Sequence, residues 1–206
     1  MRATKRNAIR HIIHMVADVD SAQMIPVGYM AKRISPKPAW LNVPHIIDIY
    51  SVGSCSSEDF ADYIPFWKHN GYWLFDSPAI LQAVAKENSI SLTNTTLFYY
   101  EAHEKELAEE GWRAFSPHAS VPTNILLPAQ KQLEGFDIVT FTAGNSPEDS
   151  PLSCNGLAED LPVNSHCLLN SFAEAESYLN SGRFDGCEPG PYRIFAVYSV
   201  PWPPLP

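Results

Sequence analysis

A cysteine and a histidine in the C-terminal third are the residues best suited to covalent chemistry. Cys154 lies in a polar loop, and His166 enters the apolar segment that follows. A loop thiol beside an imidazole can lose its proton and become a thiolate, the reactive nucleophile. Asn164, Asn155 or Glu159 would orient the imidazole. The pattern allows a thiol-dependent hydrolase or transferase with Cys154, His166 and Asn164 as catalytic residues, and the structural alternative is a cysteine that packs as a small apolar side chain.

A metal site is the weaker interpretation of the same region. Zinc prefers thiolate and imidazole ligands. The candidate ligands are Cys154, His166, Cys167 and Cys187. Because adjacent residues of a strand point to opposite faces, His166 and Cys167 would not share an ion. Glu101 and His103 share one strand face and could chelate a metal with a partner such as His118, whereas a hydrogen-bonded surface pair is the commoner arrangement.

Signatures of the common enzyme classes are missing from the sequence. The chain contains no G-x-x-x-x-G-K-[ST], no G-x-G-x-x-G, no H-E-x-x-H and no G-x-S-x-G. These motifs cradle phosphates, ligate zinc or expose a nucleophilic serine. Nucleotide-dependent and common metalloenzyme chemistry is therefore disfavoured, and we expect no metal ion and no cofactor.

An aromatic segment over residues 63–75 points to binding rather than to catalysis. Its rings are punctuated by proline and glycine, and acidic residues precede them. Exposed rings with a negative rim would anchor a basic protein partner, and the structural alternative is a small core beneath a loop. The predicted partner-binding residues are Glu58, Asp59, Asp62, Trp67, Tyr72 and Trp73.

The expected elements alternate irregularly between strands and short helices. Apolar alternation and β-branched or aromatic content predict strands over 24–34, 45–52, 95–102, 137–143, 166–169 and 192–200. Capping residues and apolar spacing predict helices over 57–63, 78–88, 104–110 and 171–179. This order predicts a loop-rich α+β fold, with a mainly antiparallel or mixed sheet and a few short helices packed on one face.

The composition indicates how many domains the chain forms and which classes of partner it disfavours. The 206 residues include 45% hydrophobic residues and 18 prolines, which fits one globular domain over 24–200 with many fixed turns. Residues 1–23 form a basic N-terminal extension, and 201–206 form a proline-rich tail. The net charge of −9 disfavours general nucleic-acid binding. The scattered cysteines, and the lack of a signal peptide or a membrane-spanning run, predict a cytoplasmic protein with reduced thiols and no membrane contact.

Two functional classes follow from these observations. The favoured hypothesis is a soluble, acidic protein-binding module, such as a bacterial immunity or antitoxin-like inhibitor. Its binding surface would be acidic and aromatic, and its partner would be another protein of basic surface. The alternative hypothesis is the thiol-dependent enzyme that uses Cys154 and His166.

Overall fold

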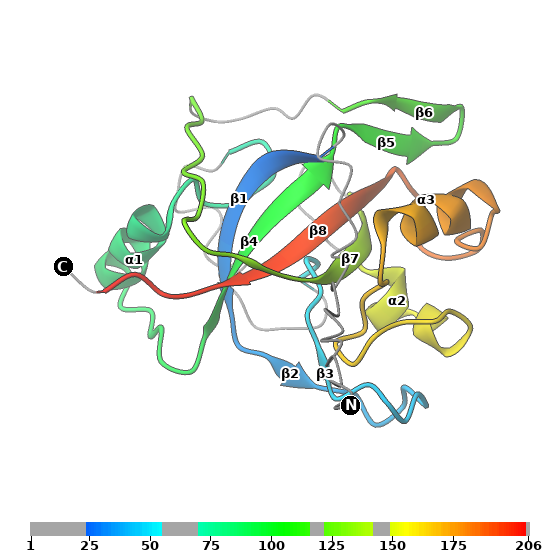
Figure 1. Ribbon diagram of the computed structural model, residues 1–206, viewed down its shortest axis with the longest axis horizontal. Coiled ribbons are helices and arrows are strands. Elements are labelled where there is room, and N and C mark those ends of the chain that lie inside the picture. The colour runs from blue at the N-terminus through cyan, green and yellow to red at the C-terminus, as the bar shows by residue number, and fades with distance from the viewer. Residues whose placement is uncertain (1–23, 55–69, 116–121, 142–148, 205–206) are drawn as a thin grey trace, which may run out of the picture.

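A computed structural model of the chain describes residues 24–54, 70–115, 122–141 and 149–204 (Figure 1). Its main element is an antiparallel sheet. The strands of this sheet are β1 (Met24–Lys32), β4 (Thr96–His103), β5 (Lys105–Ala108), β6 (Gly111–Ala114), β7 (Gln132–Thr140) and β8 (Tyr192–Val200). A second, two-stranded sheet pairs β2 (Ser35–Pro36) with β3 (Asp48–Ile49).

The final strand, β8, lies at the centre of the main sheet (Figure 1). It pairs with β4 on one side and with β7 on the other, and β1 pairs with the far edge of β4. After β4, the chain continues into β5, which reaches the start of β8 at Leu107 and Tyr192 and forms a hairpin with β6. The sheet is therefore assembled mainly from segments that are distant in the sequence.

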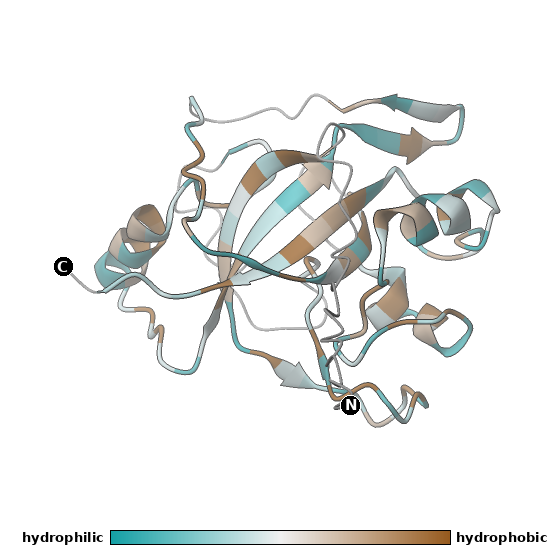
Figure 2. Cartoon of the chain, viewed as in Figure 1, coloured by the Kyte–Doolittle hydropathy of each residue, from teal (hydrophilic) through white to brown (hydrophobic). Residues whose placement is uncertain are grey.

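Aromatic and branched side chains fill both faces of the central strands. On one face, the ring of Tyr99 packs between those of Tyr29 and Tyr198, at centroid distances of 5.1 and 5.9 Å. On the other face, Phe98 stacks on Tyr100. The hydropathy colouring shows brown residues spaced along β1, β4 and β8 (Figure 2). The strands form because burying these large rings stabilises an extended, pleated backbone.

Short helices lie beside the sheet on two sides (Figure 1). The helix α1 (Pro78–Glu87) contacts β1, and its first turn is capped by Ser77 Oγ, which accepts from Ile80 N. The helices α2 (Pro151–Cys154) and α3 (Phe172–Asn180) contact β7, and the 3₁₀ turn η2 (Leu157–Glu159) follows α2. Ser171 Oγ caps α3 by accepting from Glu174 N.

The structure confirms the predicted α+β class with a mostly antiparallel sheet. The strands predicted over 95–102 and 192–200 and the helices predicted over 78–88 and 171–179 are present, with small differences at their ends. Each of these elements has either a clear capping residue or a continuous apolar pattern, and its apolar residues are buried in the fold. The local signal and the tertiary packing therefore favour the same structure.

The helix predicted over 104–110 is wrong, because β5 occupies that region. Its sequence, rich in Glu, Lys, Leu and Ala, favours a helix locally. The segment instead pairs with β6 and with Tyr192 of β8, and Glu106 is buried against Arg193. Pairing and burial outweigh the weak local preference.

The strands predicted over 45–52 and 166–169 are also largely wrong. Only Asp48–Ile49 forms a strand in the first of them. In the second, Leu169 makes isolated bridges to Phe136 and Val163, and Cys167 adopts the left-handed conformation at φ 62°. The two segments instead bond to each other through single backbone contacts, Ile47 N to Ser165 O and Tyr50 N to His166 O, and the side chain of Asn164 holds the backbone of the second segment.

Several predictions fall on residues that the structure does not describe. The basic extension over 1–23 and the helix over 57–63 lie outside the described residues.

In the C-terminal segment, Trp202 lies against the core and donates through Nε1 to Thr95 O at 3.2 Å. Among the helices of the described part, none has the length and apolar character needed to cross a bilayer.

Candidate functional site

The loop over residues 37–47, here called the Trp40 loop, presents large apolar side chains to solvent. Trp40 is 55% exposed and Ile47 is 69% exposed. Three other apolar residues of the same loop, Leu41, Val43 and Ile46, are buried in the core. The loop therefore divides its apolar residues between an inner set that anchors it and an outer pair that faces solvent.

Hydrogen bonds hold the Trp40 loop against the segment over 156–168. Ile47 N donates to Ser165 O at 2.9 Å, and Lys37 N donates to Ile47 O at 3.0 Å to close the loop. Asn42 N donates to the carboxylate of Glu159 at 2.8 Å. Such anchors fix the backbone of the loop before any partner arrives, which lowers the entropy lost on binding.

His45 and Trp40 make two further contacts between the Trp40 loop and the segment over 156–168. The imidazole of His45 lies 2.8 Å from Val163 O. Gly156, at φ 75°, lies beneath Trp40, because a Cβ at this position would be only 3.3 Å from the indole. The indole therefore rests on backbone at one edge while more than half of its surface stays exposed.

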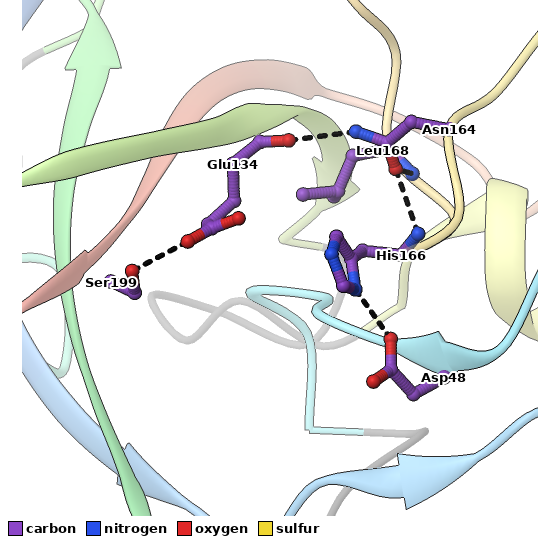
Figure 3. A network of polar contacts seen from close by, with 6 residues as sticks. All are labelled: Asp48, Glu134, Asn164, His166, Leu168 and Ser199. Carbon is purple, nitrogen blue, oxygen red and sulfur yellow. Dashed lines mark hydrogen bonds and ion pairs between the residues drawn. The ribbon is translucent and has the colours of Figure 1, made fainter.

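His166 lies where the Trp40 loop meets the segment over 156–168. Its Nδ1 is 2.6 Å from Asp48 Oδ1, and its ring stacks on Tyr50 at a centroid distance of 4.0 Å (Figure 3). The side chains of His166 and Asp48 are 26% and 21% exposed. Within the described part of the chain, Nε2 of His166 has no hydrogen-bond partner. The contact with Asp48 and the stacking on Tyr50 thus fix the orientation of the imidazole.

Asn164 shapes the turn that carries His166. Its Oδ1 accepts from the backbone N–H of His166 at 2.9 Å and of Leu168 at 3.2 Å, and its Nδ2 donates to Glu134 O at 2.7 Å (Figure 3). Asn164 was predicted to orient the imidazole directly. It instead holds the backbone, and Asp48 is the residue that orients the ring.

A carboxylate lies on the β7 side of this turn. Glu134 accepts from Ser199 Oγ at 2.5 Å (Figure 3). The pKa of Tyr50 is raised by burial first, and then by the negative charges of Asp48 and Glu134. The phenol of Tyr50 therefore stays protonated near neutral pH and can serve as a hydrogen-bond donor.

Buried charges fix the loop that follows Tyr50. Lys32 is 1% exposed, and its Nζ donates to the carbonyl oxygens of Ser51, Val52 and Gly53, each at 2.9 Å. Asp137 is fully buried and accepts from Ser51 Oγ and Val52 N, both at 2.8 Å. The side chains of Lys32 and Asp137 thus hold the same loop, the first by donating to carbonyl oxygens and the second by accepting from a hydroxyl and a backbone N–H.

The predicted nucleophile is not a free thiol in the structure. Cys154 takes part in a disulfide. The expectation that the cysteines are all reduced is therefore wrong for Cys154, and the sulfur has no thiolate in this state. His166 bonds to Asp48 and Asn164 and stacks on Tyr50. Free thiols are present at Cys167 and Cys187, and burial raises the pKa of Cys167 to about 12.

The predicted partner-binding residues are only partly described. Glu58, Asp59, Asp62 and Trp67 lie outside the described residues. Tyr72 is 5% exposed and packs edge-on against Phe115, so its side chain does not face solvent. Trp73 is half-buried. Large exposed apolar side chains of the described residues lie elsewhere, among them Trp40 and Ile47 of the Trp40 loop.

Sequence reasoning missed Asp48, Tyr50, Trp40 and Ile47. One signal was present, since the charged Asp48 interrupts an otherwise apolar segment. Its partner His166 is 118 positions away, and neither residue belongs to a known motif. The exposure of Trp40 could not be read from the sequence because neighbouring apolar residues of the same loop are buried.

The described residues include no cluster of histidine, cysteine or carboxylate side chains that could hold a metal ion. The chain matches no protein-family model, no curated protein and no solved structure.

Proposed function

We propose that this protein binds another protein of basic surface through the Trp40 loop, as a stoichiometric inhibitor of the bacterial immunity or antitoxin type. One observation carries the proposal. Trp40 and Ile47 are 55% and 69% exposed on a loop whose other apolar side chains anchor it in the core. Exposed tryptophan on a pre-ordered backbone is typical of residues that dominate binding energy.

Charge around the loop supports a basic partner. Glu159 and Asp160 are exposed in and after the turn η2, and Glu159 is tied directly to the loop through Asn42 N. The chain as a whole carries a net charge of −9. An acidic rim around an apolar centre speeds association with a basic surface and discriminates against acidic ones.

The test is a comparative co-purification with the full chain as bait. We expect the wild-type protein to retain a basic protein from the native lysate at low salt. Replacing both Trp40 and Ile47 by serine should remove that protein, because an anchor residue of an interface contributes about 2 kcal/mol or more.

A matched control separates this loop from exposed apolar surface in general. Leu126 and Leu127 are 60% and 63% exposed on a different segment. The L126S/L127S variant should retain the partner as the wild type does. Equal loss in both double variants, or retention by the W40S/I47S variant, would rule out the Trp40 loop as the binding surface.

A second candidate function is the thiol-dependent hydrolase or transferase. The observation that favours it is the 2.6 Å contact of Asp48 with His166 Nδ1, the arrangement that orients a general base in many hydrolases. Attack by Cys154 would first require reduction of its disulfide. The redox state of Cys154 also bears on the compartment, because a cytoplasmic protein normally keeps its thiols reduced.

Thiol alkylation of the folded protein tests this second candidate. If Cys154 is a nucleophile, mild reduction should make it react faster than Cys167 and Cys187 near neutral pH, and the H166N substitution should slow the reaction. Slow labelling of Cys154 after reduction, with the same rate in H166N, would rule out the thiol-dependent enzyme.

A further inference from the structure

A chain of charges leads from solvent into the core at the β5–β6 hairpin. Arg113 has a side chain that is 62% exposed, and it contacts Glu106 Oε1 at 2.7 Å. Glu106 is buried and pairs through Oε2 with Arg193, a residue of β8 whose side chain is 5% exposed. Among the residues that the structure describes, two guanidinium groups therefore share one carboxylate, and the cluster carries one positive charge more than negative charges.

Aromatic rings enclose the inner guanidinium. The Cζ atom of Arg193 lies 3.6 Å from the ring centroid of Phe115 and 3.7 Å from that of Phe141. Tyr72 packs edge-on against Phe115 at 5.3 Å. Cation–π contacts stabilise the positive charge of a guanidinium, but the rings provide no hydrogen-bond acceptors for its N–H groups.

The cluster contains buried donors that the protein does not satisfy. Within the described structure, Nε and Nη1 of Arg193 and the hydroxyl of Tyr72 are buried without a hydrogen-bond partner. Burial lowers the pKa of Arg193 to about 10 and raises that of Tyr72 to about 12, so both groups keep their protons at neutral pH. Buried donors of a charged group normally have acceptors, and unsatisfied ones call for a partner from outside the fold.

We propose that Arg193 and Tyr72 bind an oxyanion, the carboxylate or phosphate group of a small ligand. A negatively charged oxygen would accept from the free N–H groups of Arg193 and from the hydroxyl of Tyr72, and it would balance the second positive charge of the cluster. This site goes beyond the proposed protein-binding function and does not depend on it.

Thermal unfolding of the full chain in matched salts tests the site. Sodium acetate and sodium phosphate are each compared with sodium chloride at equal ionic strength. We expect one or both oxyanions to raise the midpoint of the wild-type protein, because a ligand that binds only the folded state stabilises it. A response to acetate alone identifies a carboxylate site, and a response to phosphate alone identifies a phosphate site.

The Y72F substitution removes one of the unsatisfied donors without removing the ring. We expect Y72F to be as stable as the wild type in chloride and to bind the oxyanion about tenfold more weakly, the loss expected for one hydrogen bond to a charged group. The T140V variant is the matched control, because the Thr140 hydroxyl is also buried without a partner but points to the opposite face of the sheet.

A direct spectroscopic readout completes the experiment. The Nε–H resonance of Arg193, assigned by its loss in R193K, should shift on titration with the oxyanion that raises the midpoint. The proposal is overturned if neither oxyanion exceeds chloride, or if Y72F, T140V and the wild type respond equally. An unmoved Arg193 resonance during a stabilising titration would likewise place the anion elsewhere.

Discussion

Asn164 holds the turn of the candidate site because its side chain bonds three backbone groups at once. Substitution by alanine leaves the N–H groups of His166 and Leu168 and the carbonyl of Glu134 without these partners. We expect N164A to lower the free energy of unfolding by about 2 kcal/mol, measured by urea denaturation. Ser165 takes part in the site through its backbone carbonyl, so S165A should change stability by less than about 0.5 kcal/mol. Equal effects of the two variants would contradict the role given to Asn164.

Asp137 makes stability depend on pH. Burial raises the pKa of this carboxyl, and hydrogen bonds from Ser150, Val52, Ser51 and Ile138 act in the opposite direction. A carboxyl with a raised pKa binds its proton more tightly in the folded state than in the unfolded state. Its contribution therefore favours folding most below its ordinary pKa and falls as the pH rises through the raised value.

Comparison with D137N isolates this effect, because asparagine does not titrate. The free energy of unfolding of the wild type minus that of D137N is followed by urea denaturation across acidic and neutral pH. This difference should decrease as the pH rises, because the wild type loses stability that D137N keeps. A difference that grows with pH would show that the four donors stabilise the carboxylate by more than its burial disfavours it.

At the scale of elements, Gly135 allows β7 and the turn of His166 to approach each other. It lies at an irregularity in the pairing of β7 with β8 and has φ +150°. A Cβ there would lie 2.7 Å from Leu168 Cβ and 2.8 Å from Leu169 O. We expect G135A to lower the free energy of unfolding by about 3 kcal/mol, through backbone strain together with a steric clash.

The hairpin glycine Gly111 provides the matched control for G135A. It has φ +106°, and a Cβ there would meet nothing within 4 Å. G111A should therefore lose only about 1 kcal/mol, from backbone strain alone. If both variants lost the same stability in urea denaturation, close approach at Gly135 would be excluded as the cause.

Elements with strong local signals were predictable from the sequence. The caps Ser77 and Ser171 mark the starts of α1 and α3, and the aromatic content of β4 and β8 marks two central strands. The hairpin of β5 and β6 was not predictable, because the local preference for a helix is reversed by pairing with Tyr192. The candidate site was predicted only at His166 and Asn164, since their partners Asp48 and Glu134 come from other strands.

At the scale of the whole molecule, one face of the sheet buries charged groups that an ordinary core would exclude. Strand register and alternation place Lys32, Asp137 and Arg193 on this face, with exposures of 1%, 0% and 4%. Three backbone carbonyls accept hydrogen bonds from Lys32, and four donors give hydrogen bonds to Asp137. Glu106 accepts from one nitrogen of Arg193 and leaves its other two without an acceptor among the described residues. Buried charge without full compensation is unfavourable for stability.

The outer surface shows the complementary pattern, in which apolar groups face solvent beside acids. The Trp40 loop is anchored by its inner residues and by bonds to the segment over 156–168, and therefore presents Trp40 and Ile47 on a fixed backbone. An inhibitor that must bind a basic partner tightly gains from such an arrangement, because little conformational entropy is lost on association.

Hydrogen exchange of the backbone amides, measured with and without the basic protein recovered by co-purification, tests the central claim most directly. We predict slower exchange in the complex for residues 37–47 and 157–160, and unchanged exchange for residues 122–128, which carry the exposed Leu126 and Leu127. Unchanged exchange across the Trp40 loop, together with protection on another surface, would contradict the account.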